Sequence, residues 1–256
     1  MVFGDYDVDG TTSVALVTSY LQNHLEVVVP YIPDRYKEGY GISKAGIDEA
    51  KAQGISLIIA LDCGIKAHEQ VAYANELGID FIICDHHLPD ATLPQAVAVL
   101  DPKRADCEYT YKELCGCGIG FKLIQALQQH FGLEVADLNV YLDLVATAIA
   151  ADIVPMTGEN RLLSALGIER IRQAPRAGFQ FFLSTLKKPV RVSDLVFVIA
   201  PRINAAGRMN QGISAVELLL TKSQEEALPL ARSIEFFNTE RRSTDERITK
   251  EALQQI

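Results

Sequence analysis

At 256 residues, of which 48% are hydrophobic, the chain is long enough to bury one large core or two smaller ones. Its formal net charge of −9 argues against a broad basic surface for nucleic acids, although a narrow basic groove can still lie beside an acidic metal site. No stretch approaches the ~20 apolar residues of a membrane span, no signal peptide opens the chain, and five cysteines without a regular framework fit a cytoplasmic protein.

The first hundred residues alternate between short apolar strands and helices. Strands are expected at residues 1–4, 26–31, 56–61, 79–83 and 96–100, and helices at 11–23, 43–53 and 66–77. The strands are rich in Val and Ile, as in a parallel sheet that is covered on both faces. Gly54 and Gly78 each stand between a helix and the next strand, where helices commonly stop. This part of the chain therefore predicts an α/β fold.

From about residue 118 the pattern becomes helical. Helices are expected at 121–131 and 135–151, then from about 158, at 176–186, and over 223–256. The last of these has an apolar stripe in its first half and mainly charged residues in its second half, which we expect to be solvated.

These elements suggest how the chain is organised. We expect a catalytic domain over 1–220, with its sheet over about 1–115 and a helical part over about 116–220, followed by a long connecting helix over 221–256. The first strand begins at once, and the last helix has no cap, so we expect the core of a longer protein.

Acidic residues and histidines directly follow three of the expected strands. Asp5, Asp7 and Asp9 follow the first strand, Asp62 follows the third, and Asp85-His86-His87 follows the fourth. In a parallel sheet the carboxyl ends of the strands lie at one edge, where ligands usually bind. Five Asp and two His at this edge predict a metal site for more than one ion.

Each of these carboxylates also has an ordinary structural explanation. The first three could belong to a turn and a helix cap, but a turn needs one Asp and not three that repel one another. The same segment resembles the start of a calcium loop, yet the twelfth position counted from Asp5 is Leu16 and not Glu. Asp62 alone would be a helix cap as often as a ligand, and as a ligand its two oxygens suit a bridge between two cations.

A further carboxylate, Asp152, ends the apolar run 144–151. A charge at this position is costly unless it is paired or bound to a metal. The alternatives to a metal ligand are a C-terminal helix cap or a salt bridge to Arg161.

Two other patterns carry less weight. Cys107, Cys115 and Cys117 have no fourth zinc ligand nearby, so we favour small residues that let a helix approach the sheet. The Gly116-x-Gly118-x-Gly120 run does not follow a clear strand, so a dinucleotide site is not expected. Four loop tyrosines are interpreted first as loop anchors and second as stacking platforms for bases, namely Tyr36, Tyr40, Tyr109 and Tyr111.

Taken together, these segments resemble the ordered motifs of the DHH phosphoesterase superfamily. The four motifs are Asp5-Tyr6-Asp7-Val8-Asp9-Gly10, Asp62-Cys63-Gly64, Asp85-His86-His87 and Ala151-Asp152-Ile153-Val154-Pro155. Three more segments resemble its RecJ-type single-stranded-DNA exonucleases, namely Asp34-Arg35-Tyr36, Glu38-Gly39-Tyr40-Gly41 and Pro201-Arg202-Ile203-Asn204-Ala205-Ala206-Gly207-Arg208-Met209. The last is much more specific than Asp-His-His, and the resemblance covers nearly the whole chain.

The resemblance implies a role for each matching residue. Two divalent cations, manganese first and magnesium as the alternative, would be held by Asp7, Asp9, Asp62, His86 and Asp152, with Asp62 as the bridge. His87 would contact the scissile phosphate or steady a ligand, and Asp5 would be a further acid of the first motif. Independently of the resemblance, a neutral His86 ligand needs an acceptor for its second ring nitrogen, and Asp85 is a candidate for it. Arg35, Asn204 and Arg208 would bind DNA phosphates. Carboxylates with one imidazole suit manganese or magnesium better than zinc.

The implied function is a metal-dependent exonuclease that removes mononucleotides from the 5′ end of single-stranded DNA in repair and recombination. Its partners would be a single-strand-binding protein and a helicase, and a DHH-associated domain and an oligonucleotide-binding fold would lie outside this chain. The alternatives are a phosphodiesterase of the same superfamily for short oligonucleotides or cyclic dinucleotides, and a non-catalytic relative that binds DNA or replication proteins. Such a relative is expected to have lost metal ligands, all of which are present here.

Overall fold

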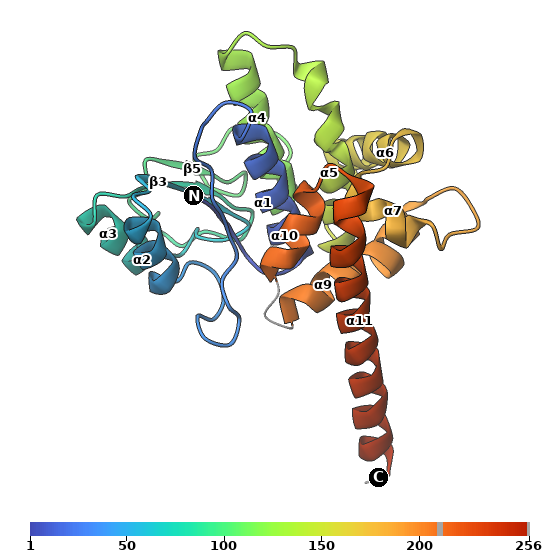
Figure 1. Cartoon of the computed structure of the whole chain (residues 1–256). Coiled ribbons are helices and arrows are strands. Elements are labelled where there is room, and N and C mark those ends of the chain that lie inside the picture. The colour runs from blue at the N-terminus through green and yellow to red at the C-terminus, as the bar shows by residue number, and fades with distance from the viewer. Residues whose placement is uncertain (209–211, 255–256) are drawn as a thin grey trace.

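A five-stranded parallel sheet forms the N-terminal part of the fold. The computed structural model describes residues 1–208 and 212–254, without the side chain of Arg208 (Figure 1). The strands are β1 (Val2–Gly4), β2 (Pro30–Tyr31), β3 (Leu57–Leu61), β4 (Asp80–Cys84) and β5 (Ala98–Leu100), in the order β2-β1-β3-β4-β5. All neighbouring pairs are parallel, which confirms the predicted α/β class.

Each face of the sheet packs against its own helices, because side chains alternate along a strand. Phe3, Ile58 and Phe81 lie in the core shared with α2 (Lys44–Ala52) and α3 (His68–Glu76). On the other face, Ile59 and Leu61 lie in the core shared with α1 (Val8–Leu21) and α4 (Gly116–His130). As predicted, Gly54 and Gly78 follow α2 and α3, with φ of 70° and 73° that suit the end of a helix.

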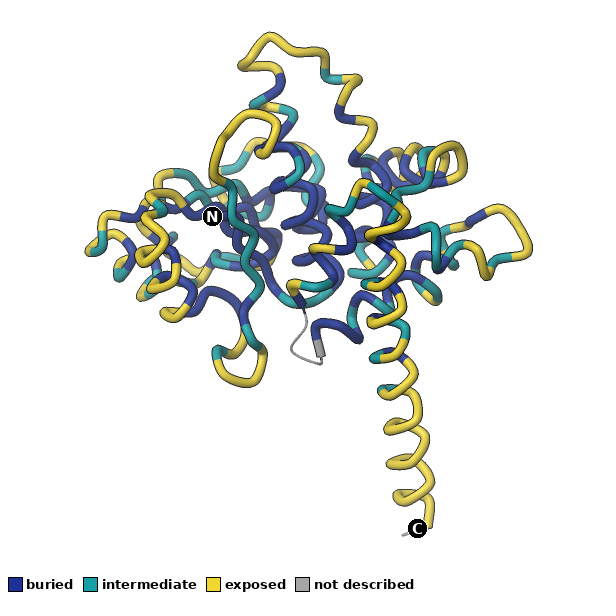
Figure 2. The backbone as a smooth tube through the Cα atoms, in the orientation of Figure 1, coloured by how far each residue is buried: buried dark blue, intermediate teal, exposed yellow. Residues whose placement is uncertain are grey.

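Helix α1 is the central element of the fold. It is buried along its length except at Ser19, because it lies between the sheet and the helical part (Figure 2). The same continuous core includes η1 (Val135–Tyr141), α5 (Leu142–Ala151), α6 (Gly158–Gln173) and α7 (Ala177–Leu183). Packing of α1 against α4 and α5 therefore connects the sheet to the helical part.

The segment after α7 contains helices that the sequence pattern did not predict. They are α8 (Val192–Asp194), the π-helical η2 (Leu195–Ile199), α9 (Ala200–Arg208) and α10 (Gly212–Leu220). The predicted long helix is α11 (Gln224–Leu253), which packs on the helical part through Ala227, Ala231 and Ile234. Its second half is exposed and extends away from the molecule (Figure 2). Within the described residues, no helix is long and apolar enough to cross a membrane.

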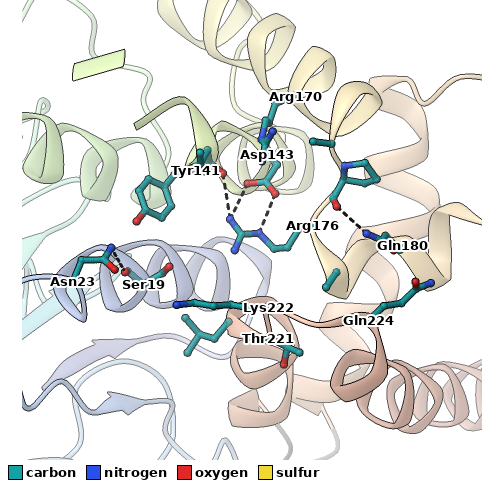
Figure 3. Close-up of a pocket in the computed structure, with 15 residues that line it drawn as sticks. Ser19, Asn23, Tyr141, Asp143, Arg170, Arg176, Gln180, Thr221, Lys222 and Gln224 are labelled. Carbon is teal, nitrogen blue, oxygen red and sulfur yellow. Dashed lines mark hydrogen bonds and ion pairs between the residues drawn. The ribbon is translucent and has the colours of Figure 1, made fainter. Parts of the chain in front are cut away.

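A buried ion pair joins the helices of this part. The Arg176 Nε donates to Asp143 Oδ2 at 2.9 Å (Figure 3). Its Nη1 donates to the carbonyl of Leu219 at 2.9 Å. The guanidinium thus connects α5, the start of α7 and the end of α10. Asp143 and Arg176 line a cavity of about 500 Å³ at the C-terminal end of α1, whose N-terminal end carries Asp9.

Candidate metal centre

The first acidic motif forms the turn between β1 and α1. Asp7 caps α1, because its Oδ1 accepts a hydrogen bond from the Gly10 N–H at 2.9 Å. Asp9 lies in the first turn and is buried. Its carboxylate accepts hydrogen bonds from the N–H groups of Gly116 at 2.6 Å and Cys117 at 2.8 Å, at the N-terminus of α4. The positive end of the α4 dipole therefore faces this carboxylate.

Asp62 follows β3 and is held in an unusual backbone conformation. Its φ is 59°, in the left-handed region that Asp tolerates better than most residues. The residue is 2% exposed, and its Oδ1 has no hydrogen-bond partner among the described residues. A buried carboxylate oxygen without a donor is unfavourable unless a cation compensates it.

One nitrogen of His86 faces three carboxylates. Its Nε2 lies 3.1 Å from Asp62 Oδ1, 3.8 Å from Asp9 Oδ2 and 3.7 Å from Asp152 Oδ2. Neither ring nitrogen of His86 makes a hydrogen bond within the described part of the chain. Asp152 is the C-cap residue of α5, so the same residue ends this helix and contributes a carboxylate to the cluster. The fold thus collects the ends of β3, β4 and α5 and the start of α1 at one point.

Asp85 supports the neighbouring histidine and the turn after β3. It accepts hydrogen bonds from the N–H of Ile65 at 2.9 Å and from the N–H of His86 at 2.7 Å, and lies 2.8 Å from Nδ1 of His87. Burial alone would raise the pKa of Asp85, but the hydrogen bonds from His87 and Ile65 lower it, and the Asp85 contact raises the pKa of His87. The expectation that Asp85 binds the ring of His86 is wrong, because the His86 ring turns toward the carboxylates.

The carboxylates are crowded enough to disfavour their charged forms. Burial, with the charges of Asp152 and Asp7 nearby, raises the pKa of Asp9 to about 7. Burial and then Asp7 raise the pKa of Asp152 to about 6, and burial with the charges of Asp9 and Asp7 raises that of Asp62 well above its usual value. Burial lowers the pKa of His86 to about 4, which keeps its imidazole neutral. The acidic oxygens repel one another and surround a neutral imidazole. Divalent cations bind such a set of ligand atoms and remove the repulsion.

Two groups of side chains have ligand atoms within 4.8 Å of one another. One contains Asp62, His86 and His87, and the other contains Asp9, His86 and Asp152. Four of the five predicted metal ligands therefore meet here, with His86 common to both groups. The fifth, Asp7, is in neither group, although its charge affects the pKa of the other three acids. Neither group contains a cysteine, and Cys115 and Cys117 are buried at the start of α4.

Arg35, the first predicted phosphate-binding residue, borders the acidic turn. Its guanidinium carbon lies 5.1 Å from the centre of the Tyr6 ring, and its charge acts on Asp5. Burial raises the pKa of Asp5 to about 7, against the effect of Arg35. Asp5 is in neither of the two ligand groups, although the charges of Asp7 and His87 act on it.

The end of α9 approaches the same turn from the helical part. A Cβ atom on Gly207 would lie 2.1 Å from the carbonyl oxygen of Tyr6, so this helix contacts the Asp5–Asp7 turn directly. Asn204 and Arg208 are four residues apart on α9 and share a helix face. The side chain of Arg208, and Met209, lie outside the described residues.

The amides that hold Asp9 were not found from the sequence. The available signal was the Gly116-x-Gly118-x-Gly120 run, because close approach of backbone to a site requires residues without a side chain. A Cβ atom on Gly116 would lie 2.5 Å from the Cβ of Asp62, whereas one on Gly120 would lie 3.2 Å from Leu61. The small residues therefore let α4 approach the sheet, as predicted.

Ile153, directly after Asp152, is strained. Its φ is 58°, in the left-handed region that β-branched residues rarely adopt. The residue is 85% exposed, so buried contacts do not offset this strain. We expect Ile153→Gly to raise the free energy of unfolding by about 0.5–1 kcal/mol, because Gly relieves a strain of about 1–2 kcal/mol while the unfolded chain gains entropy. Chemical denaturation measures this. Ile153→Ala keeps the strain and should show no gain, and a less stable Gly variant would contradict the prediction.

The comparisons with known proteins agree on one family. The model of the DHH family, N-terminal domain, matches residues 1–149. The chain is 40% identical to the single-stranded-DNA-specific exonuclease RecJ of Bacillus subtilis (strain 168) and 37% identical to that of Escherichia coli (strain K12). These matches cover 100% and 99% of this chain but only 32% and 46% of the relatives, so the chain spans less than half of their length.

Solved structures give the same result. A crystal structure of exonuclease RecJ bound to manganese matches with a TM-score of 0.90 and 33% identity, over 99% of this chain and 64% of that one. RecJ from Thermus thermophilus in complex with Mg²⁺ matches with a TM-score of 0.72 and 29% identity, over 98% of this chain and 33% of that one.

Proposed function

Because this chain belongs to the DHH family, we propose that it is the catalytic part of a two-metal exonuclease that removes nucleotides from single-stranded DNA. The observation that carries the proposal is the cluster of Asp9, Asp62 and Asp152 around one nitrogen of His86. The similarity to RecJ exonucleases over the whole chain supports the nature of the substrate.

The residues present fit a pair of manganese or magnesium ions. Asp62 Oδ1 and both ring nitrogens of His86 are buried without hydrogen bonds among the described residues. We assign Asp9, Asp62, His86 and Asp152 as ligands, with Asp62 as the bridge, and Asp7 as a fifth ligand from the rim. Two such ions, when bound, lower the pKa of a shared water and stabilise charge on the attacked phosphate.

The remaining residues act on the substrate. His87 is half exposed beside the cluster, and Asp85 both orients its ring and favours its protonated form. It is therefore suited to donate a hydrogen bond to an oxygen of the scissile phosphate. Arg35, Asn204 and Arg208 would hold neighbouring phosphates, and Asp5 would shape the turn that carries Asp7.

The finer features of the proposal come from the family. We propose attack from the 5′ end with release of mononucleotides, a role in repair and recombination in the cytoplasm, and partners that include a single-strand-binding protein and a helicase. Residues 1–220 would form the catalytic domain, and 221–256 would connect it to a DHH-associated domain.

The test is product release from single-stranded DNA labelled at one end, with manganese present. We expect a 5′ label to appear at once as a mononucleotide and a 3′ label to stay on shortening strands. This chain is compared with a form extended beyond Ile256, because the relatives are longer.

Two outcomes would contradict the proposal. Intact long DNA with cleaved dinucleotides would identify a small-substrate phosphodiesterase. Absence of manganese binding in calorimetry would identify a non-catalytic DNA-binding relative.

A further inference from the structure

A second cavity adjoins the candidate metal centre on the side of His87. It has a volume of about 600 Å³ and lies at the carboxyl ends of β3, β4 and β5. Its walls include Tyr40 from the loop after β2, Lys66 and Gln70 after β3, His87 after β4, and Lys103 after β5. We call it the His87 cavity. Its volume is within the range of sites that enclose small molecules.

Lys103 stands where this cavity meets the metal centre. It is half-buried, and its backbone N–H donates to Asp101 Oδ1 at 2.7 Å, which fixes the loop after β5. Its charge is close enough to lower the pKa of His86 and of Asp152, after the larger effects of burial and of other charges. Lys103 also lines the same cavity as His87, which would contact the scissile phosphate.

Lys103 is also the cation of this cavity that is free to bind an anion. Within residues 1–208 and 212–254 its ammonium group makes no ion pair, whereas Lys66 Nζ lies 3.5 Å from Asp90 Oδ1. Among the described residues in the wall, Asp85 is the only carboxylate, and it is turned toward His87 and the backbone. By contrast, in the cavity of Figure 3, which has a similar volume, Arg176 is paired with Asp143.

The two flanks of the metal centre thus carry separate positive groups. Arg35 is in the loop after β2, at one edge of the sheet, whereas Lys103 follows β5, at the other edge. A phosphodiester has a nucleotide on each side, so a substrate at the metal centre must extend over both flanks. The flank beyond His87 is a cavity of limited volume, which suits one nucleotide unit.

We propose that the His87 cavity is a subsite for one nucleotide unit next to the scissile phosphate, with Lys103 as its phosphate-binding residue. The inference rests on the proposed function, since it assigns one part of the same substrate. Lys103 would strengthen binding by a charge-assisted hydrogen bond.

The test measures steady-state hydrolysis of a single-stranded oligonucleotide with manganese over a range of salt concentrations. We expect Lys103→Ala to raise KM by roughly 10-fold and to lower the slope of log KM against log salt by about 0.7, the value for one lost phosphate contact on a single strand. Lys103→Arg should restore most of both. Lys187→Ala removes an exposed lysine elsewhere and should change neither.

A second measurement uses deoxyadenosine monophosphate as a competitive inhibitor. Its inhibition constant should rise in Lys103→Ala by a factor similar to that of KM, while manganese binding in calorimetry stays as tight as in the wild type. Unchanged KM, salt slope and inhibition constant in an active enzyme would overturn the subsite. Weakened manganese binding would overturn it too, because Lys103 would then act through the metal centre. If the wild-type protein cleaves no DNA, the proposed function fails instead.

Discussion

Replacing Asp62 by Asn is expected to abolish manganese-dependent hydrolysis and to make the metal-free protein more stable at pH 8. Asn also tolerates a φ of 59°, so the backbone of the turn is kept while the charge is removed. Without the proposed bridging ligand we expect activity to fall by at least about 10³-fold, at the upper end of the loss for a single transition-state contact. The residual rate is measured with single-stranded DNA and manganese.

The same substitution should raise stability although it abolishes activity, because the pKa of Asp62 is raised in the folded protein. Burial and the neighbouring acids raise that pKa in the folded protein, so folding at pH 8 carries a penalty that Asn does not have. We expect a gain of about 1 kcal/mol or more at pH 8 without metal. The gain should shrink toward pH 4, where Asp62 is protonated in the folded and increasingly in the unfolded chain.

Thermal unfolding with and without manganese separates these effects. The wild type should gain stability from manganese, whereas Asp62→Asn should gain little. Asp80→Asn is the matched control, because Asp80 is exposed at the far end of the neighbouring strand. Equal stabilisation of the wild type and Asp62→Asn by manganese would rule out Asp62 as a ligand.

Gly116→Ala is expected to destabilise the protein and to weaken manganese binding at the same time. The new methyl group would lie 2.5 Å from the Cβ and 2.8 Å from the Cα of Asp62, so α4 must move away from the turn. That movement also breaks the hydrogen bond from the Gly116 N–H to Asp9. Overpacking of this kind costs about 1–3 kcal/mol, and loss of support for a ligand reduces metal affinity by about 10–100-fold.

Gly118→Ala, two residues later in the same helix, is the control. Its methyl group would lie 3.3 Å from a terminal carbon of Leu114, a flexible side chain that can shift slightly. This change should leave manganese binding intact and stabilise α4 by up to about 1 kcal/mol. Chemical denaturation and calorimetry compare the two variants. If both bind manganese as the wild type does, the contact between α4 and Asp62 does not support the site.

The positions of most strands could be predicted because a buried parallel strand consists of a short run of apolar residues. The expected strand 26–31 is reduced to Pro30–Tyr31, since β2 is at the edge of the sheet and Val27 is exposed there. The helices between 192 and 220 were not predicted because they are short, and Pro201 and Gly207 interrupt the helical pattern.

The clustering of acids around His86 was predictable for a related reason. Parallel strands place their carboxyl ends together, so Asp62 and His86 could be brought to one edge from strand positions alone. Asp152 needed only the argument that a charge after an apolar helix requires a partner. In contrast, the partner of Asp85 and the position of Lys103 depend on how side chains turn after the chain has folded. Sequence periodicity contains no information on such rotations.

Helix α1 contributes its first turn to the metal centre and the rest of its length to the middle of the core. Amide groups in so enclosed a helix exchange with solvent mainly when the entire domain unfolds. Local unfolding is therefore not expected to change the position of Asp9 relative to the sheet. In the proposed function, adjustments that admit a strand or release a product would come from the exposed loop around Arg35. The first turn of α1 is therefore the fixed part of the candidate metal centre.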